Sequence, residues 1–423
     1  MSPIAPGDRP HIAPTPDTAV YVARQPILDR QGRTFGYELL YRAAATATSC
    51  TAAGDAEAAR VFSDAVLAHG LERLTQGHAA FINLTAPLLC SDAATLLPAS
   101  ATVLELREDI VVNQPVLDAC QRLHELGYRL ALDDFDERSD AVQLLPYATF
   151  VKIDVLATSK ERQAAIIKQL APRRIQLVAE KVETADGAAE AMALGYHHFQ
   201  GYYFCRPATV TTRSLPASRL ACLKLLAMLN RPDLSVSTLE DIVKRDPSMC
   251  YRVLRSANSA ALGARSEIRS VRQALVMIGL ARIQKWASVW VLAGVNAASA
   301  SETVAVAVIR ARCCELIGQA LSREAGADFF LLGLCSLLDA LLGQPLPLAL
   351  EGLPLSSGVR DALLGGSNLA RRVLDAVIAY ERGSWDEVTE SARGLGLPPT
   401  IFSAAYTDAL GWADELSRTA KAA

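Results

Sequence analysis

A repeated pattern in the first half of the chain most constrains the fold: short apolar segments end in, or carry near their ends, a polar residue that could bind a metal ion. Residues 130–132 are apolar and are followed at once by Asp133 and Asp134. This run is too short for a helix and follows Gly127, so it predicts a buried strand. Two adjacent carboxylates at a strand end repel each other and need water, positive side chains or a metal ion. A single pair of this kind is explained better by a solvated turn.

The pattern recurs, however, in six further segments. They are 35–42 with Glu38, 79–84 with Asn83, 102–106 with Glu105, 150–154 with Lys152, 175–179 followed by Glu180, and 197–203 with Gln200. Helix-length stretches such as 114–126 and 155–171 lie between them. Strands that alternate with helices predict a parallel sheet, and this number of strands favours a closed (β/α) barrel. Barrel active sites form at the C-terminal strand ends, where this ring of acids, amide and lysine would suit hard divalent ions.

The chain divides into unlike halves. We expect a disordered Pro-rich tail over residues 1–17, a barrel domain over 18–208, a linker over 209–217 and an all-helical domain over 218–421. A turn at 29–32 joins a first strand at 20–27 to the strand with Glu38, which predicts an antiparallel first strand pair. Ser237 and Glu240 predict a capping box. Helices are expected at 218–230, 247–259, 269–279, 281–296, 302–323, 328–342, 368–382 and 400–420.

Composition limits the partners and the compartment. The net charge is −3 and no basic stretch is concentrated, which argues against nucleic acid and anionic membrane. The sequence has no run of about 18 apolar residues and no signal-peptide pattern, so we expect no membrane span. Nine cysteines, an odd number without a Cys-x-x-Cys motif, are typical of reduced thiols in a cytoplasmic protein.

Eight short motifs occur in the order found in one known family. They are Gln25-Pro-Ile27, Glu38-Leu-Leu-Tyr-Arg42, Asn83-Leu-Thr85, Glu105-Leu-Arg-Glu108, Asp133-Asp-Phe135, Lys152-Ile-Asp154, Ala179-Glu-Lys-Val-Glu183, and Gln200-Gly201 ahead of Pro207. The first half therefore resembles an EAL domain, the cyclic di-GMP phosphodiesterase family. Each motif is weak alone, but eight in the right order over residues 19–207 are specific.

The resemblance implies a site that uses two Mg²⁺ or Mn²⁺ ions to hydrolyse cyclic di-GMP to linear pGpG. By position, Glu38, Asn83, Glu105 and Asp133 would hold one ion, and Asp133 and Asp134 the second. Lys152 and Glu180 would orient and deprotonate the attacking water with support from Gln200. Glu108 and Glu183 would brace the ligands. The nucleotide itself would meet Arg42, Gln25 and Pro207.

Three departures from the family pattern leave a second hypothesis open. The loop 136–140 is charged and lacks glycine, whereas active relatives have a Gly-rich loop there that shapes the second metal site and a dimer contact. Lys181 replaces a glycine beside Glu180, and Leu39 replaces the alanine of the signature. The alternatives are thus an active phosphodiesterase, or a degenerate domain that senses cyclic di-GMP or acts as a scaffold. A homodimer is compatible with both.

The second half resembles an HDOD domain, and EAL joined to HDOD is a bacterial signalling arrangement. The resemblance rests on Asp246-Pro247, Asn258-Ser-Ala260, Ile268-x-Ser270, Ala274, Gly279, the run from Gly333 to Asp339, and Tyr380-Glu381. The related HD phosphohydrolases need histidine ligands, but all six histidines here lie at or before His198, and Ser336-Leu337 stands at the His-Asp position. We therefore expect a non-catalytic module that contacts a protein partner. Helix capping is an equally good explanation of Asn258 and Ser270.

Overall fold

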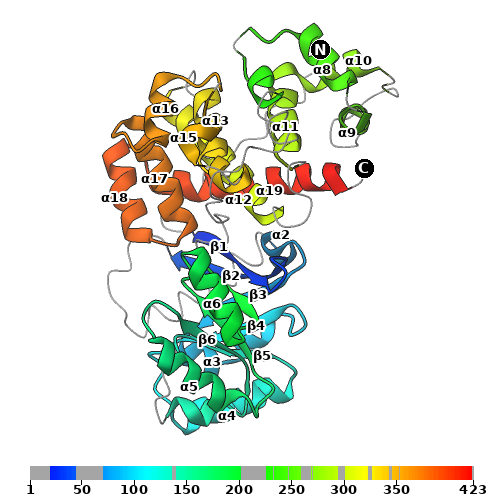
Figure 1. Ribbon diagram of the computed structural model, residues 1–423. Helices are drawn as coiled ribbons and strands as arrows, with labels where there is room; N and C mark the ends of the chain where they lie inside the picture. The colour runs from blue at the N-terminus through cyan, green and yellow to red at the C-terminus, as the bar shows by residue number, and fades with distance from the viewer. Residues whose placement is uncertain are drawn as a thin grey trace, which may run out of the picture.

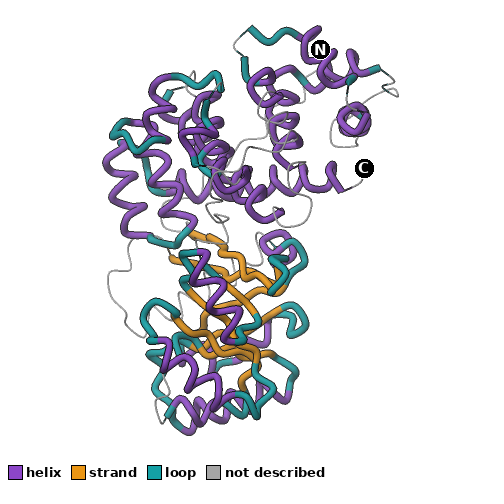
Figure 2. The backbone as a smooth tube through the Cα atoms, viewed as in Figure 1, coloured by secondary structure: helices purple, strands orange, loops and turns teal. Residues whose placement is uncertain are grey.

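The computed structural model describes residues 20–43, 70–135, 140–201, 225–231, 233–245, 247–258, 268, 270–293, 301–322, 326–342, 345–351 and 353–421. They form a barrel and a helical part, which lies over one side of the barrel (Figures 1 and 2). The expected tail at 1–17, the linker at 209–217, Pro207 and residues 136–139 of the charged loop lie outside these ranges.

The barrel is closed by eight strands that follow one another in sequence order. They are β1 Val20–Asp29, β2 Thr34–Ala43, β3 Ala79–Leu84, β4 Thr102–Leu106, β5 Arg129–Leu132, β6 Ala148–Asp154, β7 Gln176–Glu180 and β8 His198–Phe199. Strand β1 is antiparallel to β2 and to β8, and all other neighbours are parallel. The predicted barrel with an antiparallel first pair is confirmed.

Helices and turns connect the strands on the outside of the barrel. They are α2 Leu71–Thr75, α3 Ala86–Cys90, the 3-10 turns η2 Asp92–Leu96 and η3 Ala141–Leu144, α4 Gln114–Glu125, α5 Lys160–Leu170 and α6 Ala185–Leu194. Helix α5 lies within the helix-length stretch 155–171 but begins only at Lys160. The Asp154 carboxylate accepts hydrogen bonds from the amides of Leu156 and Ala157, which holds a turn there, and Ser159 then caps the helix.

Twelve helices of the helical part have bounds in the described residues. They are α8 Val236–Lys244, α9 Pro247–Ala257, α10 Val271–Ile278, α11 Leu280–Ala293, α12 Ser301–Leu321, α13 Gly326–Cys335, α14 Leu338–Leu342, α15 Leu346–Ala349, α16 Ser357–Leu363, α17 Leu369–Glu381, α18 Trp385–Leu395 and α19 Thr400–Lys421. The long helix α12 packs against α13, α17 and α19. No single described helix has the length and apolarity to span a membrane, although the sharply bent pair α10–α11 would satisfy those two criteria together.

Three expectations for this part need correction. Residues 328–342 are not one helix, because the chain turns at residues 336–337 between α13 and α14, where the Ser336 hydroxyl donates to the Gly333 carbonyl. The N-cap of α8 is Ser235 and not Ser237, since the Ser235 side chain accepts from the Thr238 amide. Helices α15, α16 and α18 are additional to those expected.

Candidate active site

The alternation of side chains along the strands brings the site together. The barrel interior is filled by Ile27, Phe81, Val103, Ala131, Phe150 and Val178. Because every second residue of a strand faces the same side, the residue two positions after each interior residue of β3 to β7 faces inward at the C-terminal rim, whereas Ile27 lies on the antiparallel strand β1. Those rim residues are Asn83, Glu105, Asp133, Lys152 and Glu180. Glu38 joins them from β2, where it pairs with Gln25 of β1.

A buried lysine lies at the centre of this rim. The Lys152 ammonium is 3.1 Å from Glu38 Oε2, 3.1 Å from Asp133 Oδ1 and 2.7 Å from Glu180 Oε1. It also forms an ion pair with Glu105. Lys152 and Glu105 are only 1% and 0% exposed, so neither charge is solvated by bulk water. One positive charge therefore faces four carboxyl groups. We call Lys152 and these four residues, Glu38, Glu105, Asp133 and Glu180, the lysine–carboxylate cluster.

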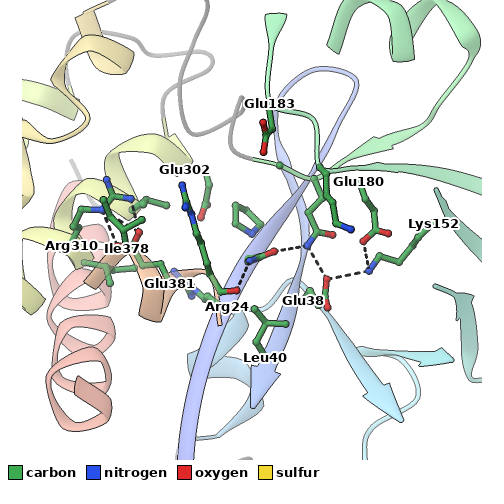
Figure 3. Close-up of a pocket in the computed structure, with 18 of the residues that line it drawn as sticks. Arg24, Glu38, Leu40, Lys152, Glu180, Glu183, Glu302, Arg310, Ile378 and Glu381 are labelled. Carbon is green, nitrogen blue, oxygen red and sulfur yellow. Dashed lines mark hydrogen bonds and ion pairs between the residues drawn. The ribbon is translucent and has the colours of Figure 1, made fainter. Parts of the chain in front are cut away.

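Amide side chains hold Glu38 in place (Figure 3). Asn83 Nδ2 donates to Glu38 Oε1 at 2.8 Å, and Gln200 Nε2 donates to Glu38 Oε2 at 2.8 Å. Gln200 also donates to Gln25 Oε1 at 2.9 Å. Gln25 in turn donates to the Arg382 carbonyl of the helical part at 3.3 Å. A hydrogen-bonded chain thus runs from the cluster to the C-terminal end of α17.

The protonation of the cluster reflects its excess of acids. Burial, and then the charges of its acidic neighbours, raises the pKa of Glu105 well above its ordinary value, and burial likewise raises the pKa of Glu180 to about 8. Burial opposes ionisation of Glu38 too, but Lys152, Gln200 and Asn83 outweigh it and lower that pKa. The pKa of Lys152 is raised despite its burial, because the surrounding carboxylates favour the charged ammonium.

The donor atoms fit hard divalent ions. Two groups of carboxylate oxygens each lie within 4.8 Å of one another: Glu38, Glu105 and Glu180, and Asp133, Asp134 and Glu180. Glu105 Oε2 and Asp134 Oδ1 are buried without a hydrogen-bond partner, which is costly unless something else bonds to them. Carboxylate and amide oxygens are the ligands that Mg²⁺ and Mn²⁺ prefer.

Two residues beside the cluster have a left-handed backbone. Asp134 has φ 42° and Lys181 has φ 54°, a region that residues with a Cβ seldom adopt. The Lys181 ammonium is 2.6 Å from Asp154 Oδ2, and its charge also acts on Asp134. The glycine that the EAL resemblance leads us to expect at position 181 would adopt this conformation without strain.

The other expected residues are spread around the rim. Glu183 is exposed and lines the cavity above the cluster, and Glu108 is exposed beside Asp133 and Asp134. The side chain of Arg42 and all of Pro207 lie outside the described part of the chain.

Sequence reasoning missed the helical wall of the cavity. The cavity has a volume of about 420 Å³ and reaches from the cluster to α12, α17 and α19. The residues that line it from these helices are Glu302, Val306, Ile309, Arg310, Ile378, Glu381, Arg382 and Tyr406. Their helical spacing is the only signal in the sequence, and an ordinary core-facing stripe has the same spacing.

The helical part buries a charge network of its own. Arg310 Nε lies 3.0 Å from Glu381 Oε1, and Arg310 Nη1 donates to the Ser336 hydroxyl at 3.0 Å. Ser336 thus binds an arginine at the position where the resemblance to HD enzymes leads us to expect a metal ligand. Ser270 caps α10, because its side chain accepts a hydrogen bond from the Gln273 amide, and this confirms helix capping as the explanation of Ser270. The Asn258 side chain donates to the Leu254 carbonyl at the end of α9, and it also bonds to both the amide and the carbonyl of Ile268, so it caps a helix and bridges two segments.

Comparison with known proteins agrees with both halves. Residues 18–207 match the model of the EAL domain, and residues 215–341 match that of the HDOD domain. The chain is 31% identical over 405 residues to the uncharacterized protein YuxH of Bacillus subtilis, covering 94% of this chain and 98% of that one. It is 29% identical over 402 residues to the cyclic di-GMP phosphodiesterase CdgJ of Vibrio cholerae, covering 94% and 93%. A solved structure of Klebsiella pneumoniae BlrP1, a manganese/cyclic di-GMP complex, aligns with a TM-score of 0.38 and 21% identity over 46% of this chain and 56% of that one.

Proposed function

Because this chain belongs to the family of proteins that join an EAL domain to an HDOD domain, we propose that it hydrolyses cyclic di-GMP to linear pGpG at the lysine–carboxylate cluster. The observation that carries this proposal is the cluster itself: four carboxyl groups around one buried lysine at the C-terminal strand ends. The relative CdgJ, aligned over nearly the whole chain, is named as such a phosphodiesterase. The helical part would be the output module and would bind a protein partner.

The proposal includes two Mg²⁺ or Mn²⁺ ions. Glu38, Asn83, Glu105 and Asp133 would hold the first, and Asp133 with Asp134 the second. The unpartnered Glu105 Oε2 and Asp134 Oδ1 support this assignment, since an ion would satisfy both atoms. Such ions would neutralise charge on the phosphodiester and lower the pKa of a nearby water molecule.

The protein's own groups then have separate tasks. Glu180 would accept a proton from the attacking water, and its raised pKa suits a base that works near neutral pH. Lys152 stays protonated and would position Glu180 and the water. Gln200 and Asn83 would keep the Glu38 carboxylate oriented.

A second candidate is a domain that binds cyclic di-GMP without turnover. The observation that favours it is Lys181, whose ammonium lies at Asp154 and acts on Asp134. A fixed cation there would compete with the second ion for the same carboxylate. Such a protein would act as a sensor or a scaffold, alone or as a homodimer.

One experiment separates the two candidates. The full chain is incubated with cyclic di-GMP and Mn²⁺, and the nucleotides are separated. We expect linear pGpG, and we expect Glu180→Gln to lower turnover by orders of magnitude while nucleotide binding persists. Glu125→Gln, an exposed position on α4, is the control. Binding without any linear product in the wild type would favour the sensor, and equal turnover in Glu180→Gln would remove Glu180 from the mechanism.

A further inference from the structure

The cavity above the lysine–carboxylate cluster has a second wall that the barrel does not provide. Helix α12 contributes Glu302, Val306, Ile309 and Arg310, at positions i, i+4, i+7 and i+8 of one helix face. Helix α17 contributes Ile378, Glu381 and Arg382, again from one face. Figure 3 shows Arg310, Ile378 and Glu381 across the cavity from Glu38, Lys152 and Glu180.

Buried bonds fix this wall to the barrel. The Tyr37 hydroxyl of β2 donates to Glu302 Oε2 at 2.8 Å, and Thr34 donates to the same oxygen at 3.1 Å. The Tyr380 hydroxyl donates to the Val22 carbonyl at 3.3 Å, and the Tyr380 ring packs against Tyr21. Tyr37 and Glu302 are both buried, so the contact is part of the core and the wall has a defined position.

The wall does not plug the cluster. In the described part of the chain, every bond made by the five cluster residues comes from the barrel. Three of the charged groups on the wall are bonded: Arg310 pairs with Glu381, and Glu302 accepts hydrogen bonds from two hydroxyl groups of the barrel. The half-buried apolar side chains on the wall are therefore Val306 and Ile378, and Leu40 of β2 lines the same cavity.

The division of chemistry in the cavity matches a nucleotide. One end carries carboxylates and a lysine that suit metal ions and a phosphodiester. The helical wall at the other end offers the half-buried apolar side chains of Val306 and Ile378, beside charged groups of Arg310, Glu381 and Glu302 that already have partners. Small-molecule sites are typically apolar with few polar groups, and a volume of about 420 Å³ lies in their usual range. A purine base has apolar faces and must extend away from the phosphodiester under attack.

We propose that Val306 and Ile378 are substrate-binding residues, which pack with Leu40 on one guanine base of cyclic di-GMP. The inference rests on the proposed function and deepens it, because it makes the site a product of both domains. Cyclic di-GMP then binds to the barrel and to the helical part at once, and its affinity depends on helices that carry no catalytic group.

The test uses the full chain with Val306→Ala and Ile378→Ala combined. In the Glu180→Gln background, which prevents turnover, the Kd for cyclic di-GMP measured calorimetrically should rise about tenfold, since five side-chain carbons leave the contact. With Glu180 intact, KM should rise similarly, while kcat and Mn²⁺ affinity stay unchanged. Val304→Ala is the matched control, because Val304 is half-buried on the same helix but does not line the cavity. Val306→Leu with Ile378→Leu should keep the wild-type affinity.

Three outcomes would overturn the inference. Equal Kd in the double variant and the Val304→Ala control would leave the wall with a purely structural role. A higher kcat/KM in the double variant would mean that the wall obstructs the substrate. Absence of any binding of cyclic di-GMP by the wild type would refute the proposed function itself. Binding by the wild type is therefore measured first, so that failure of the proposed function is distinguished from failure of this inference.

Discussion

A cation is buried against carboxyl groups in each half of the molecule, and the two cations are neutralised differently. Lys152 of the barrel is 1% exposed and meets four carboxyl groups, whereas Arg310 of the helical part is 2% exposed and meets Glu381 and the Ser336 hydroxyl. The Arg310 site is balanced, because a guanidinium and a carboxylate match in charge and in shape. The barrel cluster has three more acids than bases. Such an excess in a dry interior is costly unless protons or metal ions offset it.

The difference in charge balance indicates which half of the molecule can bind a charged ligand. The raised pKa values of Glu105 and Glu180 show that the barrel cluster takes up protons to reduce its excess charge. A metal ion would do the same and would also satisfy the unpartnered carboxylate oxygens. The arginine site has no such need, which agrees with the lack of histidines after His198.

The largest effect on stability should come from breaking the balanced site. Arg310→Met leaves Glu381 partly buried without its partner and should lower the free energy of unfolding by about 3–5 kcal/mol. Removing both charges with Arg310→Met and Glu381→Leu should recover most of that loss, because the uncompensated charge is gone. Urea unfolding with and without Mn²⁺ measures this. Rescue of Arg310→Met by Mn²⁺ would contradict a metal-independent site.

Lys152→Met should cost less, about 2 kcal/mol, because the raised pKa values of Glu105 and Glu180 keep these two carboxyls protonated near neutral pH, so fewer charges lose their partner. The cost should grow above pH 8, because the charge of Lys152 lowers the pKa of Glu180 and its removal raises that pKa further, so the variant keeps losing stability after the wild-type carboxyl has ionised. Mn²⁺ should restore stability to this variant, unlike Arg310→Met. Thermal unfolding at pH 6 and pH 8.5, in EDTA and in Mn²⁺, checks both statements. A variant that Mn²⁺ does not stabilise would argue against ions in the cluster.

The barrel and its inner rim could be predicted from the sequence because side chains alternate along a strand. Strand alternation decides where side chains point, so an apolar run ending at Asp133 or Glu105 already places that carboxylate on the inner rim. Helix boundaries were less predictable where a side chain intervened, as when Asp154 held a turn before α5. The cavity wall from α12 and α17 could not be predicted, because Val306 and Ile378 have the spacing of ordinary core residues and only the packing of the two domains shows their place.

Metal binding should be linked to pH at the barrel cluster. The pKa of Glu180 is raised to about 8, so below pH 8 this carboxyl carries a proton that an ion must displace. Mn²⁺ affinity should therefore rise with pH, by up to about tenfold per pH unit for each proton released, and level off above pH 8. Calorimetry in two buffers of different ionisation enthalpy counts the protons. An affinity that stays constant from pH 6 to pH 8 would mean that Glu180 does not take part.

The smallest effect should come from Lys181, where the barrel cluster departs from its family. Lys181→Gly removes an exposed ion pair with Asp154, which stabilises the fold by less than about 1 kcal/mol. The same substitution relieves the strain of a left-handed backbone, which costs a residue with a Cβ about 1 kcal/mol. The net stability should thus change little. Lys181→Ala loses the same ion pair but keeps the strain, so it should be about 1 kcal/mol less stable than Lys181→Gly. Both variants remove a cation that acts on Asp134, so both should bind Mn²⁺ about threefold more tightly than the wild type. An unchanged Mn²⁺ affinity in both variants would mean that Lys181 does not compete with an ion. The observation that favours a sensor without turnover would then no longer stand.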